Sequence, residues 1–312
     1  MHANSDTLTD GMIRSEHTQL NGVPVLKSIL VTGGAGFIGG WFVRHLLQAY
    51  GDRYAVTCFD SLDYCASVNN FKAVAQFPNF HFVKGDVCAP KDVENVLRSY
   101  RIDSIIHFAA RSHIDTSLND PLSFTQTNVI GTQVLLEVAR KLGSIRRFIH
   151  ISTDEVYSED DVQSPTAFTG EQSLHPTNPY SASKAATEMI VQAYRKSFHS
   201  LCDVIMCSGH INILRVRQVA EKIFRCFYPD GTYDSDNWIE FVADRPFNDG
   251  MYWTDDSNLC ALGWKQRTNF DEALRATVDW YCRDSEGFWP NHEGLGSTVV
   301  VDGDVTAEDD HI

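Results

Sequence analysis

Two short segments carry side chains that could move protons. One contains Thr153, Asp154 and Glu155, and the other contains Tyr180 and Lys184. Tyr180 and Lys184 are four residues apart, so in a helix they share one face. An ammonium group beside a phenol stabilises the phenolate and lowers the phenol pKa from about 10 toward neutrality. With the hydroxyl group of Thr153 nearby, the pair could form a base that deprotonates an alcohol while hydride leaves its carbon.

The adjacent acids Asp154 and Glu155 suggest a second chemistry. If one carboxyl group is held protonated and the other ionised, the two supply an acid and a base. Eliminating water from a ketosugar requires such a pair. The alternative interpretation is a solvated pair of loop acids together with a helix cap.

A glycine-rich turn further upstream could hold a dinucleotide. Gly33, Gly36 and Gly39 have G-x-x-G-x-x-G spacing and join a strand-like run to a helix-like one. Such glycines permit a tight turn, a close approach of backbone N–H groups to a diphosphate, and close packing of helix on strand. The helix N-terminus, where Phe37 and Ile38 lie, adds partial positive charge for the same anion.

Four further residues are expected to face the cofactor. Asp60 lies at the end of the second strand-like run, where a carboxylate can accept both ribose hydroxyls of adenosine. Ser61 follows instead of Lys or Arg, so no cation is placed for a 2′-phosphate, and NAD is favoured over NADP. Asp86 could bind the adenine amino group or cap the next helix. Small side chains that would let a dinucleotide lie close end the fourth run, at Ala109 and Ala110.

These positions must be held by alternating strands and helices. The expected strands are 28–33, 55–60, 80–86, 102–110 and 145–152, and the expected helices are 37–49, 68–76, 91–99, 122–142 and 180–197. This alternation predicts βαβ units and a parallel sheet covered on both faces. The expected fold class is therefore α/β, a Rossmann-type doubly wound parallel sheet, which binds ligands beyond the carboxyl ends of its strands.

The pattern changes after Phe198. The segment HSLCDVIMCSGH is ambiguous, and it is followed by a helix-like ILRVRQVAEKIFRCF, a strand-like WIEFVADRP and a final helix-like NFDEALRATVDWYCRD. This stretch is too short for a core of its own, so we expect it to pack on the first domain. The expected divisions are a disordered N-terminal segment (1–27), an NAD-binding Rossmann domain (28–198), a reduced substrate-binding region (199–286) and an acidic disordered tail (287–312).

Composition argues against several classes of partner. The 312 residues carry a net charge of −15, which disfavours nucleic acid and anionic membranes as partners. The eight cysteines form no CxxC pair and no His lies at zinc-ligand spacing, so we expect no metal site. The first 27 residues lack the apolar core of a signal peptide, and no stretch is long enough to cross a bilayer. These features predict a soluble, cytoplasmic protein.

The chain resembles the nucleotide-sugar 4,6-dehydratases of the extended short-chain dehydrogenase/reductase superfamily. The resemblance rests on TGGAGFIG, FDSLDYCAS, HFAARSHID, RFIHISTDEVY and PTNPYSASKAATEM, and it covers 28–198 nearly continuously and 209–285 more loosely. The Thr-Asp-Glu run is the specific part, because sugar epimerases of the superfamily usually lack the acid pair. The resemblance implies conversion of dTDP- or UDP-glucose to a 4-keto-6-deoxy sugar with NAD, and homodimers formed through 122–142 and 180–197.

The resemblance also implies a role for each residue. Tyr180, helped by Lys184 and Thr153, would take the proton of the C4 hydroxyl while hydride passes to NAD. Glu155 would then remove the C5 proton and Asp154 would protonate the departing C6 hydroxyl, before hydride returns to C6. The remaining implied contacts are Asp86, Val87, Thr127 and Lys184 to the cofactor, and Ser112, Thr153, Asp244, Arg245 and Asn248 to the substrate.

The chain also departs from this family. Several dozen residues are expected to be missing after Phe198, including one strand of the sheet and much of the pocket wall, which would leave an exposed sheet edge. Smaller departures are Ser158, Cys207 and Met251. Two alternatives therefore stay open: a catalytically impaired NAD-binding paralogue or truncated gene model, and an epimerase or decarboxylase.

Overall fold

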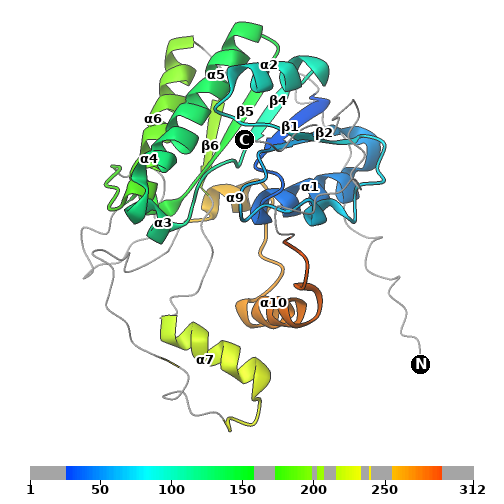
Figure 1. Ribbon diagram of the computed structural model, residues 1–312, viewed down its shortest axis with the longest axis vertical. Helices are drawn as coiled ribbons and strands as arrows, with labels where there is room; N and C mark the ends of the chain where they lie inside the picture. Colours follow the sequence, from blue (N-terminus) through cyan, green and yellow to red (C-terminus); the bar gives the residue numbers. More distant parts are fainter. Residues whose placement is uncertain are drawn as a thin grey trace, which may run out of the picture.

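A parallel sheet of six strands forms the centre of the computed structural model (Figure 1). The structure describes residues 26–157, 173–198, 202–206, 216–232, 239 and 255–289. The strands are β1 (Ser28–Thr32), β2 (Ala55–Asp60), β3 (Phe80–Lys84), β4 (Ser104–His107), β5 (Arg147–Ser152) and β6 (Cys202–Met206). Their order is β3-β2-β1-β4-β5-β6, and every neighbouring pair is parallel. The expected doubly wound α/β fold is confirmed.

Helices cover both faces of this sheet. One face carries α2 (Pro90–Ser99), α5 (Gly131–Leu142) and α6 (Pro179–Phe198), and the other carries α1 (Phe37–Tyr50). Leu30 of β1 belongs to the apolar core that includes residues of α2 and α5, whereas its neighbours Ile29 and Val31 belong to the core that includes residues of α1. Successive strand residues point to opposite faces, so a strand buried on both sides is apolar throughout, as β1 is.

Two of the expected helices differ from those in the structure. The expected helix at 68–76 is a 3₁₀ helix, η2 (Val68–Phe71), which begins where Ser67 Oγ accepts a hydrogen bond from Asn69 N. The expected helix at 122–142 consists of α4 (Pro121–Phe124), a π-helical turn η3 (Thr125–Ile130) and α5, and the short α3 (Ile114–Asn119) precedes it. The spacing of apolar residues does not distinguish α, 3₁₀ and π helices, because a 3₁₀ or π helix differs from an α-helix by less than about one residue per turn.

The sixth strand corrects one expectation. Cys202–Met206 pairs in parallel with β5, from Phe148 opposite Cys202 to Ser152 opposite Met206. The strand expected to be missing is therefore present, and β5 is not an exposed edge. A run of five residues has too little periodicity to identify it as a strand, and only its pairing with β5 does so.

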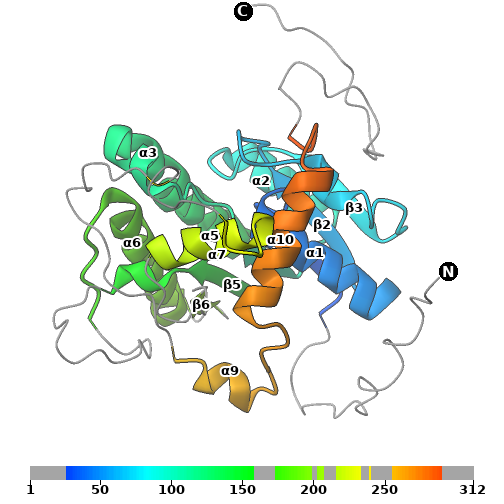
Figure 2. The ribbon, with the colours of Figure 1, turned by 90° about the horizontal axis from the view of Figure 1, so that it is seen from below.

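The region after β6 contains α7 (Val216–Phe227), α9 (Ser257–Ala261) and α10 (Phe270–Asp284). Helices α7 and α10 contact one another (Figure 2), and Lys222 Nζ lies 2.6 Å from Asp271 Oδ1. No residue of α9 or α10 is buried. The described contacts of this region with the sheet domain include two hydrogen bonds to Phe288 O, from Ser67 Oγ (2.5 Å) and Asn69 Nδ2 (2.6 Å). These hydrogen bonds join the region to the first domain, and the expectation that the whole stretch packs there stays a prediction.

Candidate active site at the carboxyl ends of the strands

The glycine turn after β1 forms the start of the candidate site. Gly33 has φ +68°, and its N–H donates to Phe59 O on β2 at 2.9 Å. A Cβ atom on Gly33 would lie 2.6 Å from Ala109 N, and one on Gly39 would lie 2.3 Å from Gly33 O. Real side chains do not tolerate such distances to backbone atoms, so the turn, α1 and the end of β4 can approach this closely only with glycine at both positions.

The N-terminus of α1 lies directly after this turn. Gly36 is the N-cap residue, with no side-chain cap, and the first turn carries no acidic residue. Phe37 and Ile38 are 72% and 52% exposed. The helix start is thus accessible, and its partial positive charge suits an anion such as a diphosphate.

Asp60 lies beside this turn at the end of β2 and is only 8% exposed. Its Oδ2 accepts a hydrogen bond from Ala35 N (3.0 Å) and its Oδ1 accepts one from Leu62 N (2.8 Å). Burial raises the pKa of Asp60, and the two backbone donors act in the opposite direction. Each carboxylate oxygen has a second lone pair, so Asp60 can still accept a hydrogen bond from a ribose hydroxyl group.

The other expected cofactor residues lie around the same edge of the sheet. Asp86 is exposed, and its Oδ1 accepts from Cys88 N (2.8 Å), which closes a turn before α2. The N-cap of α2 is Ala89, so Asp86 does not cap that helix. Val87 is buried, Thr127 is half-buried in η3, and Ala109 and Ala110 are half-buried after β4.

The acid pair follows β5. Thr153 Oγ1 accepts a hydrogen bond from Glu155 N (3.3 Å) and caps the single 3₁₀ turn η4 (Asp154–Val156). Asp154 is 4% exposed and Glu155 is half-buried. The helix cap of the alternative interpretation is therefore present, supplied by Thr153. The carboxyl group of Asp154, however, is too buried to be a solvated loop acid.

Tyr180 and Lys184 lie in the first turns of α6 and are 8% and 4% exposed. The helix begins after Asn178, whose Oδ1 accepts from Ser181 N (2.8 Å). Lys184 Nζ donates to Ile151 O at 2.5 Å. This bond holds the ammonium group at the end of β5, two residues before Thr153. The structure thus brings Thr153, Asp154, Tyr180 and Lys184 to the same end of β5.

Sequence reasoning missed two buried polar groups behind these residues. Asn128 donates through Nδ2 to Ser183 Oγ (2.8 Å), and Ser183 Oγ donates to Tyr180 O (2.7 Å). Glu188 is 3% exposed, and burial raises its pKa. The available signal was a polar side chain on the apolar face of a helix, an amide for Asn128 and a carboxyl group for Glu188.

Two buried histidines were missed as well. His107 Nδ1 lies 2.7 Å from Thr32 Oγ1, and His150 Nε2 lies 2.9 Å from Thr187 Oγ1. Burial lowers the pKa of His107 to about 3 and that of His150 well below its ordinary value, and the charge of Lys184 adds to both effects. Both rings are therefore neutral neighbours of the lysine.

The substrate half of the expected site is described only in part. Ser112 is exposed after β4. The expected substrate residues Asp244, Arg245 and Asn248, and the departures Ser158, Cys207 and Met251, lie outside the described residues. Within the described ranges, no group of three or more His, Cys, Asp or Glu side chains could hold a metal ion, and no helix is long and apolar enough to cross a membrane.

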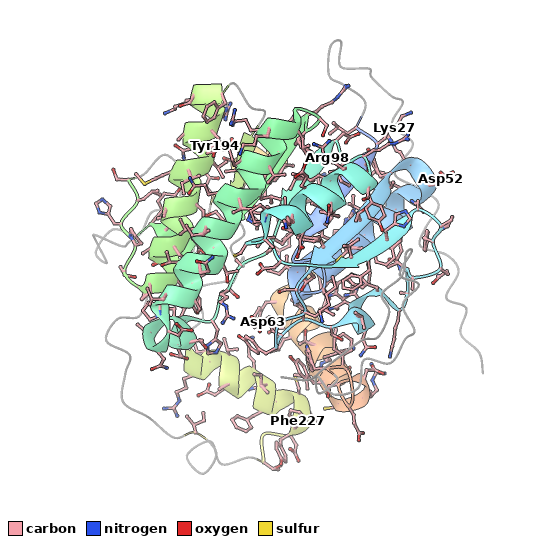
Figure 3. All side chains as sticks on the ribbon, turned by 45° about the horizontal axis from the view of Figure 1, so that its top comes forward. Lys27, Asp52, Asp63, Arg98, Tyr194 and Phe227 are labelled. Atoms are coloured by element: carbon pink, nitrogen blue, oxygen red, sulfur yellow. The ribbon has the colours of Figure 1, made fainter. Side chains whose placement is uncertain are left out.

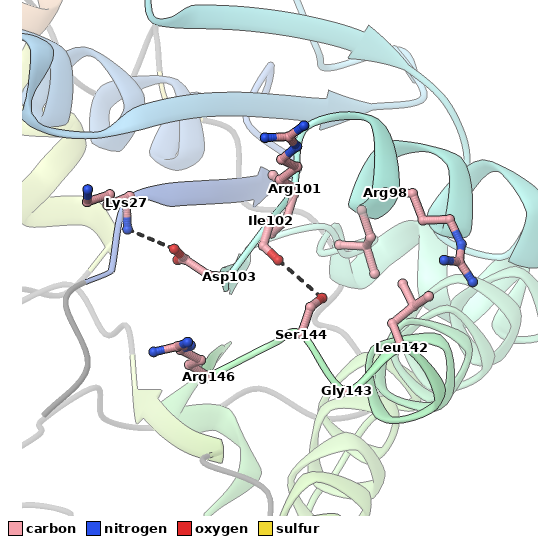
Figure 4. Close-up of a pocket in the computed structure, with 10 residues that line it drawn as sticks. Lys27, Arg98, Arg101, Ile102, Asp103, Leu142, Gly143, Ser144 and Arg146 are labelled. Carbon is pink, nitrogen blue, oxygen red and sulfur yellow. Dashed lines mark hydrogen bonds between the residues drawn. The ribbon is translucent and has the colours of Figure 1, made fainter.

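A hollow of about 530 Å³ lies at the opposite, amino-terminal edge of the sheet (Figure 4). Lys27 N donates to Asp103 Oδ2 there at 2.8 Å, and Arg98, Arg101 and Arg146 are among the lining residues. The C-termini of α2 and α5 end beside it, and cations at such ends balance their partial negative charge. It contains none of the expected site residues.

Comparison with known proteins gives a consistent family. The family model described as GDP-mannose 4,6 dehydratase matches residues 30–229. A trifunctional UDP-glucose 4,6-dehydratase/UDP-4-keto-6-deoxy-D-glucose 3,5-epimerase/UDP-4-keto-L-rhamnose-reductase of Arabidopsis thaliana is 35% identical, over 86% of this chain and 49% of that protein. The chain thus spans about half the length of this relative. The dTDP-D-glucose 4,6-dehydratase of Mus musculus is 31% identical, over 86% of this chain and 92% of that protein.

Solved structures agree with this result. A dTDP-glucose 4,6-dehydratase from Streptomyces venezuelae with NAD and TYD bound has a TM-score of 0.71 and 29% identity, over 84% of this chain and 99% of that chain. The dTDP-glucose 4,6-dehydratase of Bacillus anthracis in complex with NAD has a TM-score of 0.69 and 28% identity, over 85% of this chain and 99% of that chain. The alignment with the mouse protein runs over 336 positions but takes in only 86% of the 312 residues of this chain, so several dozen positions of that relative have no counterpart here.

Proposed function

The chain belongs to the GDP-mannose 4,6-dehydratase family, and from this membership we propose that it is an NAD-dependent nucleotide-sugar 4,6-dehydratase acting on dTDP- or UDP-glucose. One observation carries the proposal: Lys184, on the helix that also carries Tyr180, reaches the end of β5, where the buried Thr153–Asp154 turn follows, on the same edge of the sheet as the glycine turn. The acid pair favours dehydration over epimerisation, because only dehydration needs a proton for a departing hydroxyl group.

The residues around the glycine turn fit NAD. The turn and the start of α1 would face the diphosphate, and Asp60 would accept the hydroxyl groups of the adenosine ribose. Bound there, NAD supplies the acceptor and later the donor of hydride. Ala109 lies against Gly33 at the end of β4, and its small side chain would let a dinucleotide lie close to this edge.

The proposed chemistry starts at Tyr180. Its phenolate would take the proton of the C4 hydroxyl, and the Lys184 ammonium, fixed by Ile151 O, would stabilise that phenolate. The unequal burial of the two acidic residues supports the roles that the resemblance implies for them in the next two steps. Asp154 is the more buried and is suited to remain neutral and give its proton to the departing C6 hydroxyl, and Glu155 is suited to be the base at C5.

We also propose that the protein forms a homodimer through α4, η3 and α6. Large apolar side chains remain exposed there: Leu122 (79%), Ile130 (39%) and Met189 (64%). Exposed apolar side chains on neighbouring helices are typical of an interface. A second copy of the chain would cover them.

One observation favours a second candidate, a non-catalytic NAD-binding protein. Several dozen positions of the mouse relative have no counterpart in this chain. Loss of substrate-positioning residues can abolish turnover even when every catalytic side chain is present, because the reacting atoms must be held within a fraction of an ångström.

The test is product formation by the full chain with NAD and either dTDP-glucose or UDP-glucose, followed by NMR. We expect a 4-keto-6-deoxy sugar, and we expect Tyr180→Phe to lower the rate by about 10²- to 10⁴-fold while NAD binding, measured by calorimetry, is retained. NAD binding without any product would support the second candidate. A sugar inverted at C4 would identify an epimerase, and absence of NAD binding by folded protein would contradict both candidates.

A further inference from the structure

One ion pair joins the two loops that flank the glycine turn. Arg111 Nη2 lies 3.0 Å from Asp63 Oδ2. Asp63 follows β2 and Arg111 follows β4, and β1 lies between these two strands in the sheet. The pair therefore spans the end of β1, from which Gly33 begins the turn. Strands separated by one neighbour are about 10 Å apart, so two long side chains are needed to close the gap.

The backbone that carries Arg111 is fixed from both sides. Arg111 N donates to Asn128 Oδ1 (2.8 Å), and Asn128 Nδ2 donates to Arg111 O (2.9 Å). Asn128 is 1% exposed, and its Nδ2 also donates to Ser183 Oγ on α6. Because the backbone is already ordered, only the side chain of Arg111 loses freedom when it pairs with Asp63.

The loop that carries Asp63 is also held in place. Leu62 has φ +61°, a left-handed conformation that non-glycine residues rarely adopt, and its N–H donates to Asp60 Oδ1. Tyr64 N donates to the other carboxylate oxygen of Asp63, Oδ1, at 2.8 Å. Backbone strain of this kind persists where the surrounding contacts enforce it, and it is frequent at ligand clamps. Here it turns the chain after Asp60 so that Asp63 meets Arg111.

We propose that the Asp63–Arg111 pair is a clasp over the cofactor cleft that must open before NAD can leave. The inference rests on the proposed NAD-dependent function. With the diphosphate at the start of α1 and the ribose at Asp60, the dinucleotide passes between the loops that the pair joins. Figure 3 shows Asp63 at the end of the sheet that faces α7 and α10. The clasp controls retention of the cofactor and leaves the proton transfers at Tyr180 untouched.

The size of the effect follows from the exposure of the pair. The side chains of Arg111 and Asp63 are 32% and 43% exposed, so water and salt screen their attraction. We expect loss of the pair to speed NAD dissociation by about two- to five-fold. The effect should be largest at low ionic strength and vanish in concentrated salt.

The test measures the dissociation rate of NAD from the full chain by stopped-flow displacement at low and high salt. The variants are Asp63→Asn, Arg111→Gln and the double variant, and Asn keeps the acceptor for Tyr64 N. The control is Glu94→Gln, which breaks the Glu94–Arg98 pair on the exposed side of α2. We expect both single variants to release NAD faster, the double variant to release it no faster than either single one, and the control to match the parent chain.

Each outcome bears on a different part of the proposal. If the parent chain binds NAD and both single variants release it at the parental rate, the clasp is overturned and the proposed function stands. If only Arg111→Gln is faster, Arg111 acts on the diphosphate by itself and the clasp is again overturned. If folded parent chain binds no NAD, the proposed function and the clasp fail together. Matching melting temperatures of all variants show that the rates report on the pair and not on misfolding.

Discussion

Neighbouring acids acquire different environments at the end of β5. Asp154 is 4% exposed inside a turn that Thr153 caps, whereas Glu155 is half-buried. Burial disfavours the charged form of a carboxyl group, so the two residues are suited to opposite tasks. In the proposed mechanism, the division of labour between an acid and a base would therefore come from their surroundings and not from their residue types.

This division predicts the behaviour of Glu155→Gln. In the proposed mechanism, oxidation at C4 needs Tyr180 and Lys184, whereas removal of the C5 proton needs the carboxylate of Glu155. We expect product formation to fall by about 10²- to 10⁴-fold while NADH absorbance accumulates on mixing with substrate. Glu137→Gln, which alters an exposed ion pair on α5, is the control. Normal product formation by Glu155→Gln would assign the C5 base to another residue.

At the scale of elements, close contact between β1, α1 and β4 depends on glycine. A Cβ on Gly39 would lie 2.3 Å from Gly33 O, whereas one on Gly143, at the end of α5, would have no atom within 4 Å. We expect Gly39→Ala to cost about 1–3 kcal/mol of unfolding free energy and to weaken NAD binding at least tenfold, because the helix must move away from the turn.

Gly143→Ala is the matched control for this prediction. Gly143 has φ +66°, so alanine there costs about 1–2 kcal/mol through backbone strain alone. Urea unfolding and calorimetric titration with NAD separate the two effects. Equal losses of NAD affinity in both variants would show that stability, and not the shape of the turn, limits binding.

The buried histidines of β4 and β5 predict the response to acid. His107 has a pKa of about 3 in the folded chain against an ordinary value of 6.5, so the unfolded chain takes up the proton first as the pH falls. Stability therefore declines from about pH 6.5 downward, at up to about 1.4 kcal/mol per pH unit for this residue, and the decline ends near its folded pKa.

His107→Gln should remove this contribution, because a neutral amide replaces the ring between Thr32 and Thr132. We expect the unfolding free energy to depend on pH less steeply, by about one proton, between about pH 6.5 and 5. Urea unfolding at several pH values measures the slope, and His45→Gln on the exposed side of α1 is the control. An unchanged slope would mean that His107 is protonated in the folded chain.

At the scale of the whole molecule, the exposed apolar side chains of α4 and α6 predict its association. Leu122→Asp and Met189→Asp each place a charge where the proposed homodimer would exclude water. We expect both variants to sediment as monomers at concentrations where the parent chain sediments as a dimer, because an unpaired buried charge costs several kcal/mol. Leu262→Asp, at a position that is 85% exposed in the C-terminal region, is the control. A monomeric parent chain would contradict the proposed interface.

The sequence by itself determined the strand–turn–helix unit that is proposed to hold the cofactor. Gly33, Gly36, Gly39 and Asp60 belong to one strand–turn–helix–strand unit, so their spacing carries most of the information about their geometry. The alternation of apolar runs with amphipathic stretches likewise predicted the α/β class and five of the six strands, because periods of 2 and 3.6 residues are local properties.

Only the tertiary structure decided the rest. The strand β6 is defined by pairing with β5, Asp154 owes its burial to the chain packed around η4, and Asp63 meets Arg111 across β1. Each of these features joins segments that are distant in the sequence. Their partners depend on strand order and register, which arise from the burial of the whole core, and no short window of residues contains that information.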